Sequence, residues 1–253
     1  MSSITLGAIV FACLFGASLV GIVIRSKLPS HHLDSESKDV IRLSTAVVGT
    51  LSALALGLLI ASAKNVFDSS EAELRTSVAH VLLLDRLMSH YGAETSQARD
   101  HLHQLVENRL VQGWGSRSEQ AGIDPYNEAQ SIEPVQAELR ELKPKTEPQR
   151  LLQSRALEVS AQLAEAHWML VESKSEGLPT AFLVILVFWL AWLFLTFGLQ
   201  APVNSTVIGV MLICSLSVAA AVFLVVDMAH PYLGIIRVSE GPLREALAHL
   251  GRE

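Results

Sequence analysis

The sequence lacks positive charge over a long stretch in its second half. Between Lys174 and Arg237 it contains no Lys or Arg, and the only acids there are Glu176 and Asp227. A water-soluble domain does not need so long an uncharged segment, whereas two membrane helices and a short connector do. This absence excludes an ordinary soluble fold for the segment and predicts a pair of helices in lipid.

Ionisable side chains are also absent from the interior of every long apolar run. Such residues usually mark proton relays or ion pathways, so a proton-coupled transporter is disfavoured. Each run is close to the ~20 residues needed to cross a hydrocarbon core of about 30 Å. The first run has no basic segment before it and is longer than a signal-peptide core of ~7–15 residues, so we expect it to be retained. The four predicted spans are Ile4 to Ile24, Leu43 to Ala63, Thr180 to Leu199 and Thr206 to Val226.

Cysteine and catalytic motifs are scarce as well. The two cysteines, Cys13 and Cys214, fall inside predicted spans, where a disulfide is not expected. No G-x-S-x-G, P-loop or glycine-rich dinucleotide motif is present, so neither an enzyme nor a cofactor is predicted. His31 and His32 fit no established metal-ligand spacing, and we expect no metal site.

The polar segment between the second and third spans has helical spacing and no period-two alternation. We predict a helix that continues from the second span to Tyr91 and Gly92, followed by helices over 94–111, 134–142 and 148–173. Acids outnumber bases in this segment, which accounts for the formal net charge of −6 and argues against nucleic-acid binding.

The fold class predicted from these patterns is an all-α integral membrane protein. Four transmembrane helices form two hairpins that flank a helical extramembrane insert. The expected divisions are 1–63 for the first hairpin, 64–179 for the insert, 180–226 for the second hairpin and 227–253 for a C-terminal tail.

Small residues recur at every fourth position of the second span, at Gly49, Ala53, Gly57 and Ala61. Such a stripe lets helix backbones approach closely in lipid, where packing drives association. Two interpretations are open: contact with a neighbouring helix of the same subunit, or a stripe that faces a subunit interface or a pore.

A weaker stripe of small residues runs along the first span. Ala8, Ala12 and Gly16 follow the same four-residue step, and Gly21 comes after them. We therefore expect the first two spans to form a close hairpin.

Charged side chains collect at the ends of the spans. Lys38 and Arg42 precede the second span, and Lys64 follows it. Groups of this kind either anchor helix ends among lipid headgroups or ring the mouths of a pore and select ions by sign.

Several stretches of the sequence resemble a mainly bacterial family of bestrophin-like membrane proteins, over nearly the full length of the chain. The resemblance implies a four-span membrane protein and, more distantly, the arrangement of bestrophins. Those are oligomeric anion channels in which a large helical cytosolic region lies between two membrane hairpins. The matching stretches are Leu28 to Leu33, Glu36 to Leu43, Leu56 to Lys64, Phe188 to Leu190, Phe197 to Asn204, Pro231 to Ser239 and Pro242 to Arg244.

The orientation in the membrane is nearly a tie by charge alone. The first loop holds Arg25, Lys27, Lys38 and Arg42, whereas the insert ends and the tail hold Lys64, Arg75, Lys174, Arg237 and Arg244. The resemblance implies a bacterial inner-membrane protein with both termini and the insert in the cytoplasm.

Two hypotheses for function follow. The first is a homo-oligomeric channel for chloride or other anions, in which the second span lines or supports the pore and Lys38, Arg42 and Lys64 lie at its mouths. The alternative is a non-conducting membrane scaffold or sensor whose helical insert binds a protein partner.

Overall fold

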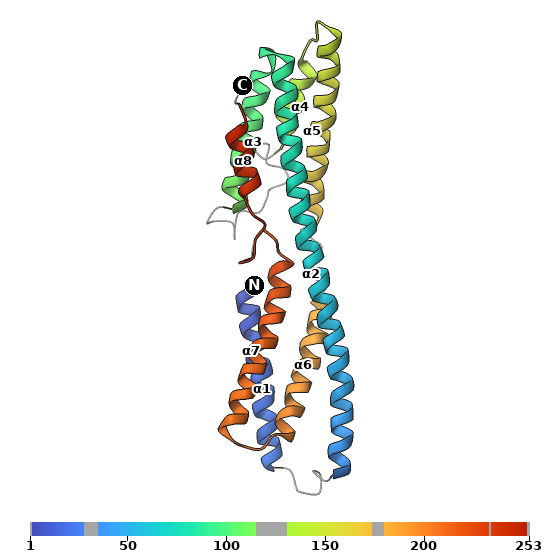
Figure 1. The fold of residues 1–253 in the computed structure, drawn as a ribbon, viewed down its shortest axis with the longest axis vertical. Helices are drawn as coiled ribbons and strands as arrows, with labels where there is room; N and C mark the ends of the chain where they lie inside the picture. The colour runs from blue at the N-terminus through green and yellow to red at the C-terminus, as the bar shows by residue number, and fades with distance from the viewer. Residues whose placement is uncertain (1, 28–34, 115–130, 174–179, 233, 252–253) are drawn as a thin grey trace. The chain divides into compact units, whose positions relative to one another are not determined.

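A computed structural model describes residues 2–27, 35–114, 131–173, 180–232 and 234–251 of the protein. The chain divides into two compact units. The first, which we call the membrane unit, comprises Met1–Phe67 and Gly177–Ile236. The second, the helical unit, comprises Asp68–Glu176 and Arg237–Glu253. Figure 1 shows the helices of both units, and each unit is described in turn.

The membrane unit contains the four predicted spans. They are α1 (Ser3–Lys27), the first part of α2 (Ser35–Tyr91), α6 (Thr180–Gln200) and α7 (Ser205–Met228). All four helices are long and apolar enough to cross a membrane. The residues that the structure describes form no strand. The prediction of an all-α membrane protein is confirmed.

The closest helix contact in the membrane unit joins α1 to α6. A Cβ atom built on Gly21 would overlap the Leu195 carbonyl oxygen and lie 2.9 Å from the Leu199 nitrogen. A Cβ on Gly198 would in turn overlap the carbonyl oxygen of Ser18. Only glycine fits at both positions, because each backbone occupies the space that a side chain on the other would need.

We expected the first span to pack most closely against the second, and this expectation is wrong. α1 packs against α6 and α7, and its closest glycine contact is with α6. Ala8 and Ala12 are exposed, and a Cβ on Gly16 would meet nothing within 4 Å. The close approach is made by Gly21, which follows the stripe, and spacing along one helix cannot identify the helix opposite.

α2 joins the core of the membrane unit through a narrow face. Leu59 and Ala63 are buried in that core. Nearer the start of the helix, the Thr45 hydroxyl lies 3.3 Å from that of Thr196 on α6, and both residues are buried. In the most apolar stretch of α2, only 11% of the residues are buried. The corresponding share is 28% for α1 and 33% for α6. α2 thus leaves most of its apolar surface uncovered within one copy of the chain.

The helical unit is a bundle built on the second part of α2. It adds the short helix η2 (Ala93–Thr95), α3 (Ser96–Trp114), α4 (Glu133–Glu141), α5 (Glu147–Ser173) and α8 (Gly241–His249). Its core holds the fully buried side chains Leu84, Met88, Leu102, Leu139 and Val159. Near the core, the Arg99 Nε donates to Asp85 Oδ1 at 2.8 Å, so the carboxylate has a cationic partner.

The C-terminal tail contributes to the core of the helical unit. Leu243, Ala246 and Leu250 from α8 and the residue after it are buried in the same cluster as Leu84 and Leu102. A single hydrophobic core cannot be divided by a bilayer. The tail and the insert therefore lie on the same side of the membrane, as the even number of helices between them requires.

Candidate functional site

The exposed surface of α2 in the membrane unit has two different faces. One carries large apolar side chains, of which Leu54 and Leu58 are each 68% exposed. The other carries small side chains at spacings of three and four residues, which keep them on one side of a helix. We call this second set the small face; it consists of Ala46, Thr50, Ala53, Gly57 and Ala61, all of them exposed.

The predicted stripe lies largely on this small face. Ala53, Gly57 and Ala61 are exposed, and a Cβ on Gly57 would meet nothing within 4 Å. Gly49 lies at the edge of the face, where a Cβ would make an ordinary contact of 3.9 Å with Leu193 of α6. Within one copy of the chain, three of the four stripe residues therefore do not serve packing between helices.

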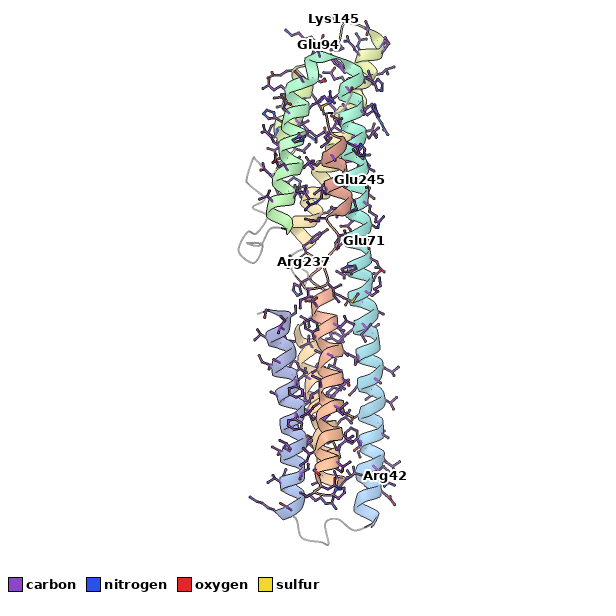
Figure 2. All side chains as sticks on the ribbon, turned by 60° about the vertical axis from the view of Figure 1, so that its left-hand side comes forward. Arg42, Glu71, Glu94, Lys145, Arg237 and Glu245 are labelled. Atoms are coloured by element: carbon purple, nitrogen blue, oxygen red, sulfur yellow. The ribbon has the colours of Figure 1, made fainter. Side chains whose placement is uncertain are left out.

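The predicted pore-mouth charges lie toward the two ends of this part of α2. The Arg42 side chain is 76% exposed, and its ion pair with Asp39 is long, at 4.0 Å. Lys64 is exposed, with its Nζ 5.8 Å from the centre of the Phe67 ring. Lys38 belongs to α2, but its side chain lies outside the described residues. Figure 2 shows Arg42 near the first-loop end of the membrane unit.

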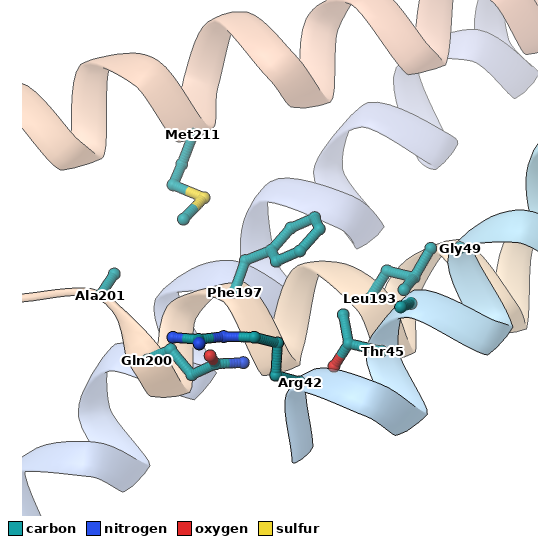
Figure 3. Close-up of a pocket in the computed structure, with 9 residues that line it drawn as sticks. Arg42, Thr45, Gly49, Leu193, Phe197, Gln200, Ala201 and Met211 are labelled. Carbon is teal, nitrogen blue, oxygen red and sulfur yellow. The ribbon is translucent and has the colours of Figure 1, made fainter. Parts of the chain in front are cut away.

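A pocket of about 540 Å³ opens beside Arg42, a volume typical of small-molecule sites, which span roughly 300–1,000 Å³. It is formed by three helices of the membrane unit. Figure 3 shows the guanidinium of Arg42 and the amide of Gln200 at one end of it, with Phe197 in the middle and Leu193 and Gly49 at the other end. The remaining lining residues are Thr45, Ala46, Ala201 and Met211.

A second arginine lies at the same end of the membrane unit. Arg25, in the last turn of α1, donates from Nη1 to the backbone carbonyl of Gln200 at 3.0 Å. This bond satisfies a carbonyl at the end of α6 that has no partner within its own helix. Two arginines thus flank the last turn of α6. Arg25 binds its backbone, and Arg42 lines a pocket together with the Gln200 side chain.

The opposite end of α7 contains a buried carboxylate. Asp227 is 1% exposed, and its two oxygens accept the amides of Ile235 at 3.1 Å and Ile236 at 2.8 Å. A Cβ on Gly234 would come within 2.7 Å of the Asp227 Cγ, so the loop needs glycine there. Asp227 therefore fastens the loop after α7 rather than facing an ion path.

The acidic and histidine groups do not form a metal centre in the described part of the chain, where no cluster of three such residues is found. The Nδ1 of His230 lies 2.8 Å from the carbonyl oxygen of Val226 one turn earlier in α7. His31, His32 and the matching stretch Leu28 to Leu33 fall outside the described residues.

Sequence reasoning identified Arg42 and Gly49 but did not predict that they line one pocket with Gln200. These residues come from the second span and the end of the third, and no spacing rule connects them. Arg42 lies in the family stretch Glu36 to Leu43, and Gln200 lies in the stretch Phe197 to Asn204. This shared membership is the only signal in the sequence that could have suggested the pocket.

A comparison with protein families gives a match over most of the chain. A family model described as a Bestrophin-like domain matches residues 12–243, which include most of α1 and all of α2, α6 and α7. No curated protein and no solved structure matches the chain.

Proposed function

The chain belongs to the bestrophin-like family, and from that premise we propose that it assembles as a homo-oligomeric channel for chloride or other anions, with the small face of α2 around the pore. The family relationship supports a channel rather than an enzyme. The proposal adds the oligomer, the pore-lining helix and the ion.

The observation that carries the proposal is the exposure of the small face. A glycine inside a helix costs about 1 kcal/mol relative to alanine. Within one copy of the chain no close helix contact offsets this cost at Gly57, since no described atom lies within 4 Å of a Cβ built there. Small residues with nothing to pack against are explained if helices from other copies come close, or if a water-filled path needs width at that depth.

The second exposed face of α2 supports assembly in the same way. Leu43, Val47 and Leu54 project from α2 and are each more than 60% exposed. In an oligomer this apolar face would contact lipid or the adjacent copy, while the small face would turn toward the axis. Each of the two faces then has a distinct environment.

The charges at the two ends of the membrane part of α2 favour an anion. Lys38 and Arg42 precede the small face and Lys64 follows it, while no acid interrupts the sequence between Arg42 and Lys64. Cations repeated around an axis raise the local concentration of anions at both mouths of a pore.

The experiment is chloride flux from liposomes that contain the purified full chain. We expect flux above that of empty liposomes, and we expect Gly57→Leu to reduce it strongly because each copy would add a bulky side chain at the same depth. Gly209→Leu on α7 is the matched control, since Gly209 also has nothing within 4 Å but lies outside the small face. Absence of flux in either protein orientation would refute conduction.

The proposed location is the bacterial inner membrane, with the insert and both termini in the cytoplasm. A cysteine introduced at Glu141, which is exposed on α4 of the helical unit, tests the orientation. An impermeant maleimide should label it in inverted vesicles and not in intact spheroplasts. The opposite labelling pattern would reverse the orientation.

A second candidate is a non-conducting scaffold whose helical unit binds a protein partner. It is supported by two large apolar side chains on α5, Trp168 and Met169, which are 48% and 59% exposed. In that case liposomes would show no flux, whereas the double variant Trp168→Ser, Met169→Ser would lose a partner that the unmodified chain retains in a pull-down.

A further inference from the structure

The pocket beside Arg42 is amphipathic along its length. The Arg42 guanidinium and the Gln200 amide lie at the end where α6 gives way to the connector, and the hydroxyl of Thr45, which also lines the pocket, donates to the Ile41 carbonyl at 2.7 Å. Its other end is formed by Leu193 and Gly49, about two turns deeper along α6 and α2. A ligand that fits both ends needs a polar anionic head and an apolar body.

The polar end carries a positive charge that is weakly compensated. The Arg42 guanidinium is mostly in solvent and 4.0 Å from Asp39, which is itself 71% exposed. Arg25 and Lys27 lie in the last turn of α1 at the same end of the membrane unit. Among the side chains that the structure describes at this end, three cations, Arg25, Lys27 and Arg42, stand against one acid, Asp39.

The apolar end continues into a surface that lipid chains contact in a membrane. Phe197 is 42% exposed beside the pocket, and Met211 contributes a flexible thioether from α7. The pocket lies where the apolar parts of α2 and α6 meet their polar ends, which is the depth of lipid phosphates. A phosphodiester at this depth would meet the guanidinium, and its acyl chains would extend along Leu193 and Phe197.

We propose that this pocket binds an anionic phospholipid, with the lipid phosphate on Arg42 and the Gln200 amide and an acyl chain along Leu193, Phe197 and Met211. Arginine suits this role because its planar donors match two phosphate oxygens at once. An anionic headgroup is favoured over a zwitterionic one because a headgroup ammonium would be repelled by Arg25, whose guanidinium lies 3.0 Å from the Gln200 carbonyl.

This proposal does not rest on conduction. All residues of the pocket belong to one copy of the chain, and binding is measured without any ion flux. If both proposals hold, Arg42 serves a lipid phosphate, and Lys38 and Lys64 are left as the cations at the pore mouths.

Lipid binding is tested on the delipidated full chain in a neutral detergent. Three probes are titrated: phosphatidylglycerol, phosphatidylcholine and glycerol 3-phosphate. Native mass spectrometry counts the bound molecules, and the apparent Tm reports stabilisation. We expect phosphatidylglycerol to bind and raise the Tm, phosphatidylcholine to bind more weakly, and glycerol 3-phosphate to have no effect at the same concentration.

Two charge variants separate a specific site from general attraction to the surface. Arg42→Gln should weaken phosphatidylglycerol binding by about tenfold, the loss typical of a charged hydrogen-bond partner. Lys27→Gln removes the same charge from an exposed position at the same end of the unit, outside the pocket, and should leave the affinity nearly unchanged. Equal affinity for wild type and Arg42→Gln, or an equal loss in both variants, would overturn the proposal.

A third variant fills the apolar end without changing charge. A Cβ at Gly49 makes only an ordinary contact with Leu193, so a leucine there can extend into the pocket. Gly49→Leu should displace the bound lipid while Gly209→Leu retains it. If Gly49→Leu binds phosphatidylglycerol as well as wild type does, the acyl chain lies elsewhere; if glycerol 3-phosphate binds as tightly as the lipid, the site takes free phosphate. Either result refutes the lipid assignment.

Discussion

Substitution of Gly21 by alanine tests the packing of α1 on α6, the contact that organises the membrane unit. The new methyl group would overlap the Leu195 carbonyl oxygen and lie 2.9 Å from the Leu199 nitrogen. Both obstacles are backbone atoms of a helix, so they cannot rotate away as a side chain would. The two helices must therefore separate locally, and the contacts around Gly198 and Ser18 loosen with them.

The expected cost follows from two opposing terms. Overpacking typically costs about 1–3 kcal/mol, and the upper end applies because backbone is struck. Alanine is better than glycine in a helix by about 1 kcal/mol, which offsets part of this cost. The net loss of about 2 kcal/mol corresponds to a fall in Tm of about 4–8 °C for a chain of this size.

The assay is thermal unfolding of the full chain in detergent, followed by intrinsic tryptophan fluorescence at a fixed heating rate. Gly16→Ala is the matched control, because Gly16 lies on the same helix and a Cβ there meets nothing within 4 Å. It should be neutral or slightly stabilising. If Gly21→Ala unfolds at the same temperature as Gly16→Ala, α1 does not pack on α6 as described.

Two further predictions concern charged groups. Asp227→Asn should speed hydrogen exchange at the backbone amides of Ile235 and Ile236, because the side-chain NH₂ group that replaces one carboxylate oxygen cannot accept a hydrogen bond. Unchanged exchange would contradict the role of Asp227 in holding this loop. Asp85→Ala should destabilise the helical unit by about 2–3 kcal/mol, since it removes the carboxylate to which the partly buried Arg99 guanidinium donates. Glu71→Ala breaks an exposed pair and should cost less than about 1 kcal/mol in the same thermal assay; equal losses would show that burial of the first pair is unimportant.

The sequence predicted the helices of this fold well because their signals are local. Apolar length alone located the four spans, and the break at Tyr91 and Gly92 matches the end of α2. The predicted segments 134–142 and 148–173 lie within one residue of α4 and α5, where Pro134 and Pro148 mark the first turns. Signals of this kind depend on neighbours along the chain, which the sequence lists in order.

The contacts between helices were much less predictable. The small residues of the first span predicted a close approach to the second span, whereas Gly21 meets Gly198 of α6, a residue far away in the chain. Leu82 on α2 is 37% exposed, while Leu84, two residues further on, is fully buried. The partner of a helix face depends on the arrangement in space, and helical spacing carries little information about it.

The candidate site was predictable only in part for the same reason. Ala53, Gly57 and Ala61 are exposed within one copy of the chain, which the spacing of the stripe alone did not indicate. The pocket between Arg42 and Gln200 had no signal beyond the two family stretches that contain these residues, since it depends on how the end of α6 meets the start of α2. The pore-lining role of the stripe and of Lys38, Arg42 and Lys64 stays a prediction.

The place of α8 has a consequence for biosynthesis. The core of the helical unit needs Leu243 and Ala246, which follow both membrane hairpins in the chain. While a ribosome is still making α6 and α7, the apolar surface of α3 that α8 later covers remains open to water, although domains usually fold as they emerge. Nascent protein at this stage would be a target for chaperones and proteases, so cells could degrade copies whose second hairpin has failed to insert before they reach assembly.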